Sequence, residues 1–168
     1  SSSGGTEKTR FFLSGGYFAQ EGIIVNSDYN RFNLRVNVDA EISKRLRIGT
    51  STYGSHGFGR FANTESHYGQ GGLISNALAA SPTIPVYDDE GNYYFNQADV
   101  TDGLGFLANV LAVSEGTEDR RKAMDIFTNN YLEFDITEDV MFRTSVGVNY
   151  NSNNIKLWRS SAVPNFTT

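Results

Sequence analysis

The sequence contains no cysteine, only three prolines and no long hydrophobic run. The absence of cysteine excludes disulfide scaffolds, thiolate zinc sites and cysteine nucleophiles. No stretch approaches the ~18 apolar residues of a membrane-spanning helix. Basic residues are also in the minority, with 14 Lys and Arg against 19 Asp and Glu in 168 residues, which argues against a nucleic-acid-binding surface.

Glycine and aromatic residues are abundant by contrast. The chain has 17 glycines and is 13% aromatic, while its hydrophobic fraction is a modest 39%. Few prolines and many aromatics argue against disorder. A modest hydrophobic fraction does not exclude the membrane, because spanning β-strands need apolar residues only at every second position.

The clearest pattern is a two-residue alternation over residues 31–40. Apolar side chains occupy every even position of this stretch, and polar side chains occupy every odd position. This alternation indicates a strand with one apolar side and one wet side. A helix would bring Arg35 and Val38 onto one face, so the strand interpretation is preferred.

Similar alternation elsewhere predicts about five strands in all. They span residues 8–20, 29–40, 44–54, 125–136 and 139–151. The first is the least regular, since Phe12 and Phe18 fall on its polar side. Five strands do not close a membrane barrel, which needs about eight. The unpaired backbone groups at an open sheet edge have no water to bond in lipid. We therefore expect the chain to form an incomplete barrel by itself and to be one piece of a larger one.

The connections between these strands alternate between short and long. Residues 41–44 and 137–139 form tight turns, residues 20–28 form a moderate connection, and residues 55–124 form a very long loop. Outer-membrane barrels have this arrangement, with short turns on the periplasmic side and long loops outside. The pattern therefore predicts an all-β fold, an antiparallel transmembrane β-barrel segment with long, structured extracellular loops. Aromatics near the strand ends match the interfacial girdles of such barrels, although aromatics also favour strands in general.

Energetics assign the two faces of such a sheet. An arginine that faces lipid near the middle of the membrane costs ~2–4 kcal/mol, whereas valine there costs nothing. The polar face should therefore point into the lumen of the barrel. The residues expected to face the lumen are Arg31, Arg35, Glu133, Asp135 and Arg143.

The long loop carries structure of its own. The sequence predicts a short helix over residues 71–81, which Pro82 ends. It also predicts a β-hairpin over residues 85–95, with its turn at residues 89–92. A folded loop of this kind is a candidate surface for a ligand or partner. The residues expected to contact a substrate or partner are Tyr87, Asp88, Tyr93, Tyr94 and Trp158. Alternatively, these aromatics hold the loop to the rim of the barrel.

No pattern of catalytic or metal-binding residues is found. His56 and His67 lie in a glycine-rich loop without the spacing of a zinc site, and solvated histidines explain them better. The acidic run at residues 88–92 lacks the ligand spacing of a calcium loop. The acid pair at residues 118–119 lies in a solvated run beside two arginines, and Glu133 and Asp135 belong to the inward face of a strand, so neither pair supports glycosidase chemistry. We therefore expect no metal, no cofactor and no enzymatic activity.

Three collinear stretches resemble recurring segments of the SusC/RagA-type TonB-dependent outer-membrane transporters. They are Glu7-Lys8-Thr9-Arg10-Phe11-Phe12-Leu13-Ser14-Gly15-Gly16-Tyr17-Phe18 with Gln20-Glu21-Gly22-Ile23-Ile24, Asn76-Ala77-Leu78-Ala79-Ala80-Ser81-Pro82-Thr83-Ile84-Pro85-Val86-Tyr87-Asp88 with Gly91-Asn92-Tyr93, and Phe142-Arg143-Thr144-Ser145-Val146-Gly147-Val148-Asn149-Tyr150. One departure is the absence of a proline after Asn109. The plug domain and the other N-terminal parts of the family have no counterpart among these 168 residues.

The resemblance implies a function that the alternation alone does not. It implies a place in the outer membrane of a Gram-negative cell and import of an oligomeric nutrient, a glycan or a peptide. The implied partners are a SusD-like surface lipoprotein, the outer-membrane lipid, and the TonB complex, which would act through the missing N-terminal part. A soluble carbohydrate-binding β-domain and a passive porin are the alternatives.

Overall fold

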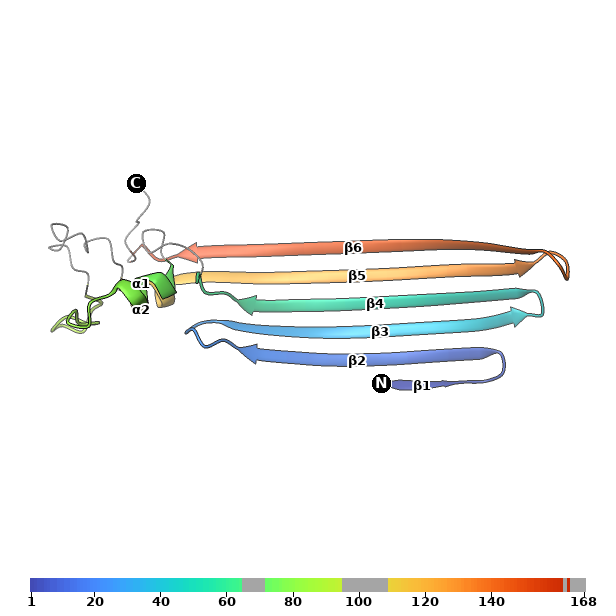
Figure 1. The fold of residues 1–168 in the computed structure, drawn as a ribbon, viewed down its shortest axis with the longest axis horizontal. Coiled ribbons are helices and arrows are strands. Elements are labelled where there is room, and N and C mark those ends of the chain that lie inside the picture. Colours follow the sequence, from blue (N-terminus) through green and yellow to red (C-terminus); the bar gives the residue numbers. More distant parts are fainter. Residues whose placement is uncertain (65–71, 95–108, 162, 164–168) are drawn as a thin grey trace. The chain divides into compact units, whose positions relative to one another are not determined.

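The computed structural model describes residues 1–64, 72–94, 109–161 and 163. Within these ranges the chain forms six strands and two short helices (Figure 1). The strands are β1 (Ser2–Gly5), β2 (Thr9–Glu21), β3 (Asp28–Ser43), β4 (Leu46–Arg60), β5 (Thr117–Asp135) and β6 (Met141–Arg159). The helices are α1 (Leu73–Ala79) and α2 (Val110–Gly116).

The strands pair in sequence order in a single open sheet. β1 lies antiparallel to β2 with Ser2 opposite Leu13 and Gly5 opposite Arg10. The predicted fold class is confirmed: the chain is all-β, and its antiparallel sheet is not closed. The sheet has six strands where about five were expected. The short β1, with the sequence Ser-Ser-Gly-Gly, has no alternation that could reveal it.

Three strands run further than their alternation predicts. β4 continues to Arg60, β5 already begins at Thr117, and β6 continues to Arg159. Backbone hydrogen bonds from Phe61 N to Asp119 O (2.9 Å) and from Ser160 N to Gly116 O (2.8 Å) hold these extensions together. Glycines in β4 and a charged run at the start of β5 hide the two-residue period there. The loop between β4 and β5 is shorter than expected as a result.

The chain divides into two compact units. The first unit, residues 1–20, 29–58 and 121–154, contains most of the sheet and its three tight turns (Figure 1). All the buried hydrophobic side chains of the described residues lie outside it, at Leu73, Ala112, Val113 and Val163. The first unit is thus a single layer of strands without a hydrophobic core of its own.

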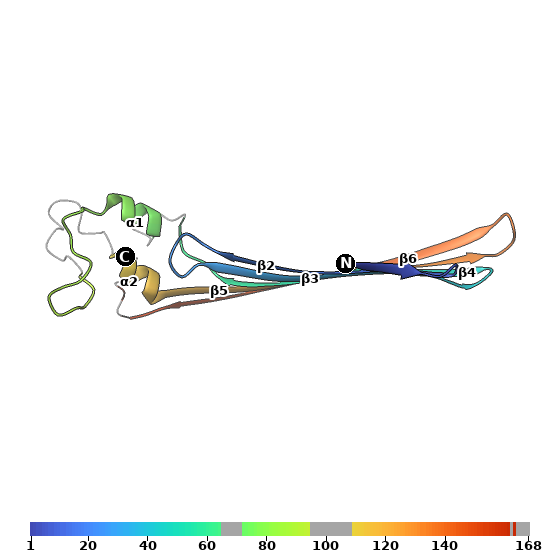
Figure 2. The same ribbon diagram turned by 90° about the horizontal axis from the view of Figure 1, so that it is seen from below.

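The second unit, residues 21–28, 59–120 and 155–168, has a small core of its own. Leu73 of α1, Val113 of α2 and Val163 form its centre, and Ile24 packs against them. The two helices contact one another; they overlap in the view of Figure 1 and are seen separately in Figure 2. Of the helices that the structure describes, none has the length and apolar character needed to cross a membrane.

The second unit confirms two expectations about the loop. Helix α1 falls within the predicted residues 71–81, and a bridge between Tyr87 and Tyr93 closes the predicted hairpin. Gly91 takes a φ of 84° in the turn, a conformation that favours glycine. Helix α2 was not predicted.

Candidate functional site

The strands of the first unit carry a polar row and an apolar row on opposite faces, as the alternation predicts. Contacts between neighbouring strands show which residues share a face. Ser51 of β4 donates to Asn37 of β3 (2.9 Å), and Ser55 of β4 donates to Asp125 of β5 (3.3 Å), all on one face. On the other face, the hydroxyls of Thr52 and Thr128 lie 2.9 Å apart.

The polar face carries an ion-pair network across three strands. Arg47 of β4 donates to both Glu133 (3.0 Å) and Asp135 (2.9 Å) of β5. Arg143 of β6 pairs with the second oxygen of Glu133 at 2.9 Å. Glu133 is the most enclosed member, its side chain only 15% exposed. One carboxylate thus fixes two arginines, and the three strands are cross-linked through their side chains.

Tyr131 extends this network to β3. Its hydroxyl donates to Asp39 (2.7 Å), and the Arg143 guanidinium lies 4.8 Å from the centre of its ring. The tyrosine crosses β4 at Gly49, where a Cβ would lie 2.0 Å from the ring and 2.6 Å from the Asp39 carboxylate. A glycine is therefore required at this position for the ring to reach across the intervening strand. We call Asp39, Arg47, Tyr131, Glu133, Asp135 and Arg143 the polar-face network.

The structure brings together three of the five residues expected to face a lumen. Glu133, Asp135 and Arg143 belong to the polar-face network. Arg35 lies on the same face, with its guanidinium 5.7 Å from the ring centre of Tyr53. Arg31 is four positions from Arg35 on β3 and so shares its side of the strand, but it lies apart from the network.

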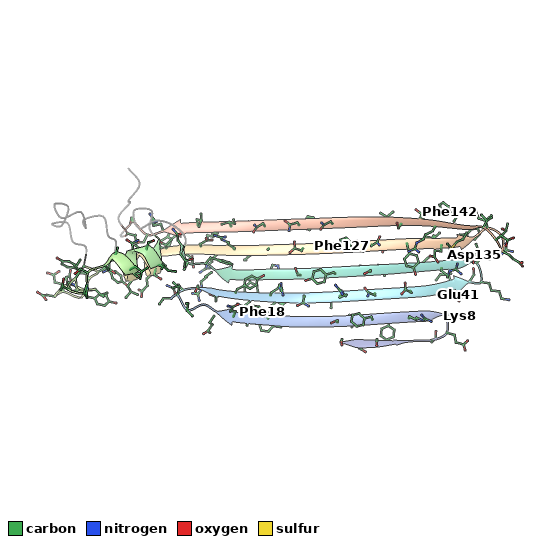
Figure 3. All side chains as sticks on the ribbon, in the orientation of Figure 1. Lys8, Phe18, Glu41, Phe127, Asp135 and Phe142 are labelled. Atoms are coloured by element: carbon green, nitrogen blue, oxygen red, sulfur yellow. The ribbon has the colours of Figure 1, made fainter. Side chains whose placement is uncertain are left out.

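The opposite face is apolar and exposed. Its large side chains are between 36% and 62% exposed, and none has a second layer of this unit to pack against. Tyr17 and Phe32 contact one another on it, with ring centres 4.6 Å apart, and Phe58 extends the group. Phe142 lies near the tight turns, as does Asp135, whereas Phe18 lies toward the far end of β2 (Figure 3). The exposed members are Phe11, Leu13, Tyr17, Phe32, Leu34, Ile48, Met124, Leu132, Phe134, Phe142, Val146, Val148 and Tyr150.

The hairpin of the second unit is ordered by its own side chains. The rings of Tyr87 and Tyr93 stack with their centres 5.4 Å apart. Asp88 accepts from the backbone N–H groups of Glu90 (3.0 Å) and Asn92 (2.8 Å) across the turn. The Asp88 carboxylate thus stabilises the turn, and the Tyr87 side chain is 48% exposed.

Tyr93 also connects the hairpin to α2. Its hydroxyl donates to the Glu115 carboxylate (2.5 Å). This hydrogen bond raises the pKa of Tyr93 from 10.0 to about 12, because it stabilises the neutral phenol. Tyr94 follows on the hairpin, and its backbone N–H donates to Val86 O (3.0 Å). Tyr87, Asp88, Tyr93 and Tyr94 therefore form one group.

Trp158 belongs to a different group. It lies on β6, 54% exposed, and lines a depression of about 190 Å³ with Arg60, Glu115 and Glu118. His56 is exposed on β4 beside Phe58, with ring centres 5.9 Å apart, and His67 lies outside the described residues. Within the described ranges no three His, Asp or Glu side chains lie close enough to hold a metal ion.

The sequence interpretation missed three residues that organise these sites. Arg47 and Tyr131 fall on the polar alternation of their strands, but only the pairing of β4 with β5 shows what they contact. Asn109 accepts from the N–H groups of Leu111 and Ala112 at the start of α2 and donates to Val86 O (2.7 Å). A side-chain cap of this kind was the available signal for α2. The helix begins where the family pattern would have a proline.

Comparison with known proteins gives a consistent picture. No protein-family model matches the chain. The TonB-dependent receptor P3 of Formosa agariphila is 28% identical over 165 residues, which cover 96% of this chain and 16% of the receptor. The TonB-dependent receptor P39 of the same organism is 25% identical over 150 residues, 89% of this chain and 13% of the receptor. The TonB-dependent receptor SusC of Bacteroides thetaiotaomicron is 27% identical over 166 residues, 88% of this chain and 16% of the receptor.

The chain is similar to a segment of SusC-type TonB-dependent receptors. The match runs along most of its length, as the three collinear stretches predicted. The chain spans about a sixth of the length of these receptors. Their names describe receptors and not enzymes, and an open sheet is the fold that a SusC-type barrel segment would have.

Proposed function

We propose that this chain forms part of the β-barrel of an outer-membrane active transporter. The observation that carries the proposal is the single-layer sheet with one apolar and one polar face. A soluble domain would cover its apolar rows with a second layer of side chains. In a barrel wall, lipid covers the apolar row and water bathes the polar row.

The two faces then have definite environments. Phe32, Leu34 and Val36 contact lipid, whereas Arg31, Arg35 and the polar-face network line a water-filled lumen. Solvent-exposed ion pairs such as those of Arg47 contribute little stability one by one, because water screens the charges. Their main effect is to keep opposite charges matched along the inner wall, so that the lumen is polar without a large field of one sign.

The similarity to SusC-type receptors supports the finer part of the proposal. The transporter imports an oligomeric nutrient, a glycan or a peptide, across the Gram-negative outer membrane. It works with a SusD-like surface lipoprotein and takes energy from TonB. The loop between β4 and β5 lies on the cell surface, where Tyr87 and Trp158 are available for substrate or partner contacts.

The face assignment is tested by two substitutions in the middle of β3. Val36→Arg places a charge on the lipid face, at a cost of ~2–4 kcal/mol near the membrane centre. Asn37→Arg, at the next residue, places the same charge on the polar face of the strand. We expect Val36→Arg to lower the amount of assembled receptor and the temperature at which its compact form unfolds in gel electrophoresis. Equal effects of the two substitutions would refute the face assignment.

Transport itself is tested by uptake. Cells that depend on the full receptor are supplied with oligosaccharide or peptide mixtures, with and without an intact TonB system. We expect uptake that requires both the receptor and TonB. Uptake that continues unchanged without TonB would instead identify a passive porin.

A further inference from the structure

An apolar groove of about 580 Å³ lies in the second unit, between the β2–β3 connection, the two helices and the start of the hairpin. Its volume is in the range of ligand-binding pockets. Aliphatic side chains dominate the lining, among them Ile23, Leu73, Leu78, Ile84, Val86 and Leu111. Among the residues that the structure describes, no aromatic side chain lines the groove, so these residues offer no surface on which a sugar ring could stack.

The polar side chains that line the groove are already engaged within the chain. Asn109 donates to the carbonyls of Val86 and Tyr94 and accepts from two N–H groups of α2. Ser114 donates to Val25 O (3.2 Å), and the Ser81 hydroxyl is paired with Thr83 (2.8 Å). A sugar hydroxyl in the groove would lose water without gaining a side-chain partner from these three residues, which disfavours a glycan.

Aliphatic side chains also stand open at the mouth of the groove. Ile23 is fully exposed at 101% and Leu78 is 84% exposed. The Ile23 backbone is held in place by its neighbours, since Gly22 N and Ser27 O are hydrogen-bonded at 2.9 Å. Exposed aliphatic side chains around an apolar groove mark a site of interaction with a protein, a membrane or a ligand.

The charge of the surrounding segments is one-sided. Residues 21–28, 72–94 and 109–116, which supply the groove, contain six acidic residues and no lysine or arginine. Asp28 is neutralised by Arg60 from β4, and Glu115 is hydrogen-bonded by Tyr93. Asp89 and Glu90 remain exposed at the turn of the hairpin, three and four residues after the groove-lining Val86. A positively charged partner is favoured by this arrangement.

We infer that the groove binds a polypeptide segment of a separate surface protein, one that presents aliphatic side chains flanked by lysine or arginine. The aliphatic side chains fill the space between Ile23, Leu78 and Leu111, and the basic residues meet the acidic hairpin. The inference rests on the proposed function in one respect, because it places this loop outside the cell, where such a protein is accessible.

Short peptides test the inference on the full purified receptor, held in lipid nanodiscs. The probes are the labelled peptide Lys-Leu-Leu-Lys and two matched peptides, Glu-Leu-Leu-Glu and Lys-Ser-Ser-Lys. We expect Lys-Leu-Leu-Lys to bind at least about tenfold more tightly than either, since both its aliphatic and its basic residues contribute. Equal binding of the three peptides would overturn the inference.

Two leucine substitutions locate the binding. Leu78→Ser removes an exposed aliphatic side chain from the groove, and Leu157→Ser removes another, 70% exposed, from β6 outside it. We expect Leu78→Ser to weaken Lys-Leu-Leu-Lys binding about tenfold and Leu157→Ser to leave it unchanged. Weaker peptide binding in both variants, or in neither, contradicts the inference. Native mass spectrometry also contradicts it if the receptor carries a bound lipid chain that is lost in Leu78→Ser.

Peptide binding and transport fail separately in this design. A receptor that binds the peptide through Leu78 but shows no TonB-dependent uptake would refute the proposed function and leave the inference about the groove supported. A receptor that transports but does not distinguish the peptides would refute the inference about the groove and leave the proposed function supported.

Discussion

At the scale of single residues, the polar face depends on side chains that reach across a neighbouring strand. Tyr131 passes over Gly49 to Asp39, and Glu133 holds Arg47 and Arg143 from opposite sides. The value of Gly49 lies in the absence of a Cβ, which leaves room for the tyrosine ring. A small residue in one strand thus determines the side-chain contacts of the two strands beside it.

Gly49→Val should displace Tyr131 from Asp39. The added carbon would lie 2.0 Å from the ring, and overpacking of this kind costs roughly 1–3 kcal/mol. Gly147→Val on the polar face of β6 is the control, because the nearest atom to its Cβ is 3.8 Å away. We expect only Gly49→Val to lower the unfolding temperature of the compact receptor on gels. Equal unfolding temperatures would show that the Tyr131 contact adds no stability.

The phenol of Tyr93 should titrate at an unusually high pH. Its pKa of about 12 is set mainly by the hydrogen bond to Glu115. A raised pKa means that the folded loop favours the neutral phenol, so this contact stabilises the loop fully below pH 10 and is lost as the pH rises through about 12. Glu115→Ala should return the Tyr93 pKa toward 10.0. Tyrosinate absorbance measures this pKa, and Tyr93→Phe identifies which titration step belongs to Tyr93. A Tyr93 step at the same pH in Glu115→Ala would refute the contact.

At the scale of elements, Asn109 connects α2 to the hairpin. Its side-chain oxygen caps α2, and its amide nitrogen donates to the carbonyls of Val86 and Tyr94. One side chain therefore holds two elements of the loop. The groove depends on this connection because Val86 and Leu111 both line it.

Two substitutions at Asn109 should separate these roles. Asn109→Asp keeps the capping oxygen but loses the amide donor, so we expect faster hydrogen exchange in residues 85–94 alone. Asn109→Ala loses both, at a cost of about 0.5–2 kcal/mol for the cap, and should also speed exchange in residues 110–116. Identical exchange patterns in the two variants would contradict this division.

At the scale of the whole molecule, the first unit exposes apolar side chains without a core to receive them. The small core of the described residues belongs to the second unit, at Leu73, Val113 and Val163. Stability of the sheet must therefore come from its surroundings, and in a barrel wall those surroundings are lipid on one side and the rest of the barrel at both edges.

A receptor that contains this chain should need detergent or lipid to remain dispersed. Side chains such as Tyr17, Val146 and Val148, each more than half exposed, would otherwise associate between molecules. Size-exclusion chromatography after detergent removal tests this, with aggregation as the expected result. A monodisperse peak without detergent would favour a soluble carbohydrate-binding domain.

The sequence by itself determined five of the six strands, their two faces and the position of the long loop. Alternation is a local property, since neighbouring side chains of any strand point to opposite sides, and so Arg35, Glu133 and Val36 could be assigned to faces without knowledge of their neighbours. The helix that ends before Pro82 and the turn at Gly91 are local in the same sense. Where glycine or a charged run interrupted the two-residue period, as in β4 and β5, the predicted strands were shorter than the observed ones.

Only the tertiary structure decided which side chains meet. Arg47 and Asp135 are 88 residues apart, and Asn26 and Ser114 are also 88 apart, so their contacts depend on the register of strands and on how a long loop folds back. A shift of one residue in the register would move every polar side chain of a strand to the other face, and the hydrogen bonds between backbones fix that choice. The polar-face network and the loop groove follow from this pairing, because each is built from segments that are distant in the chain.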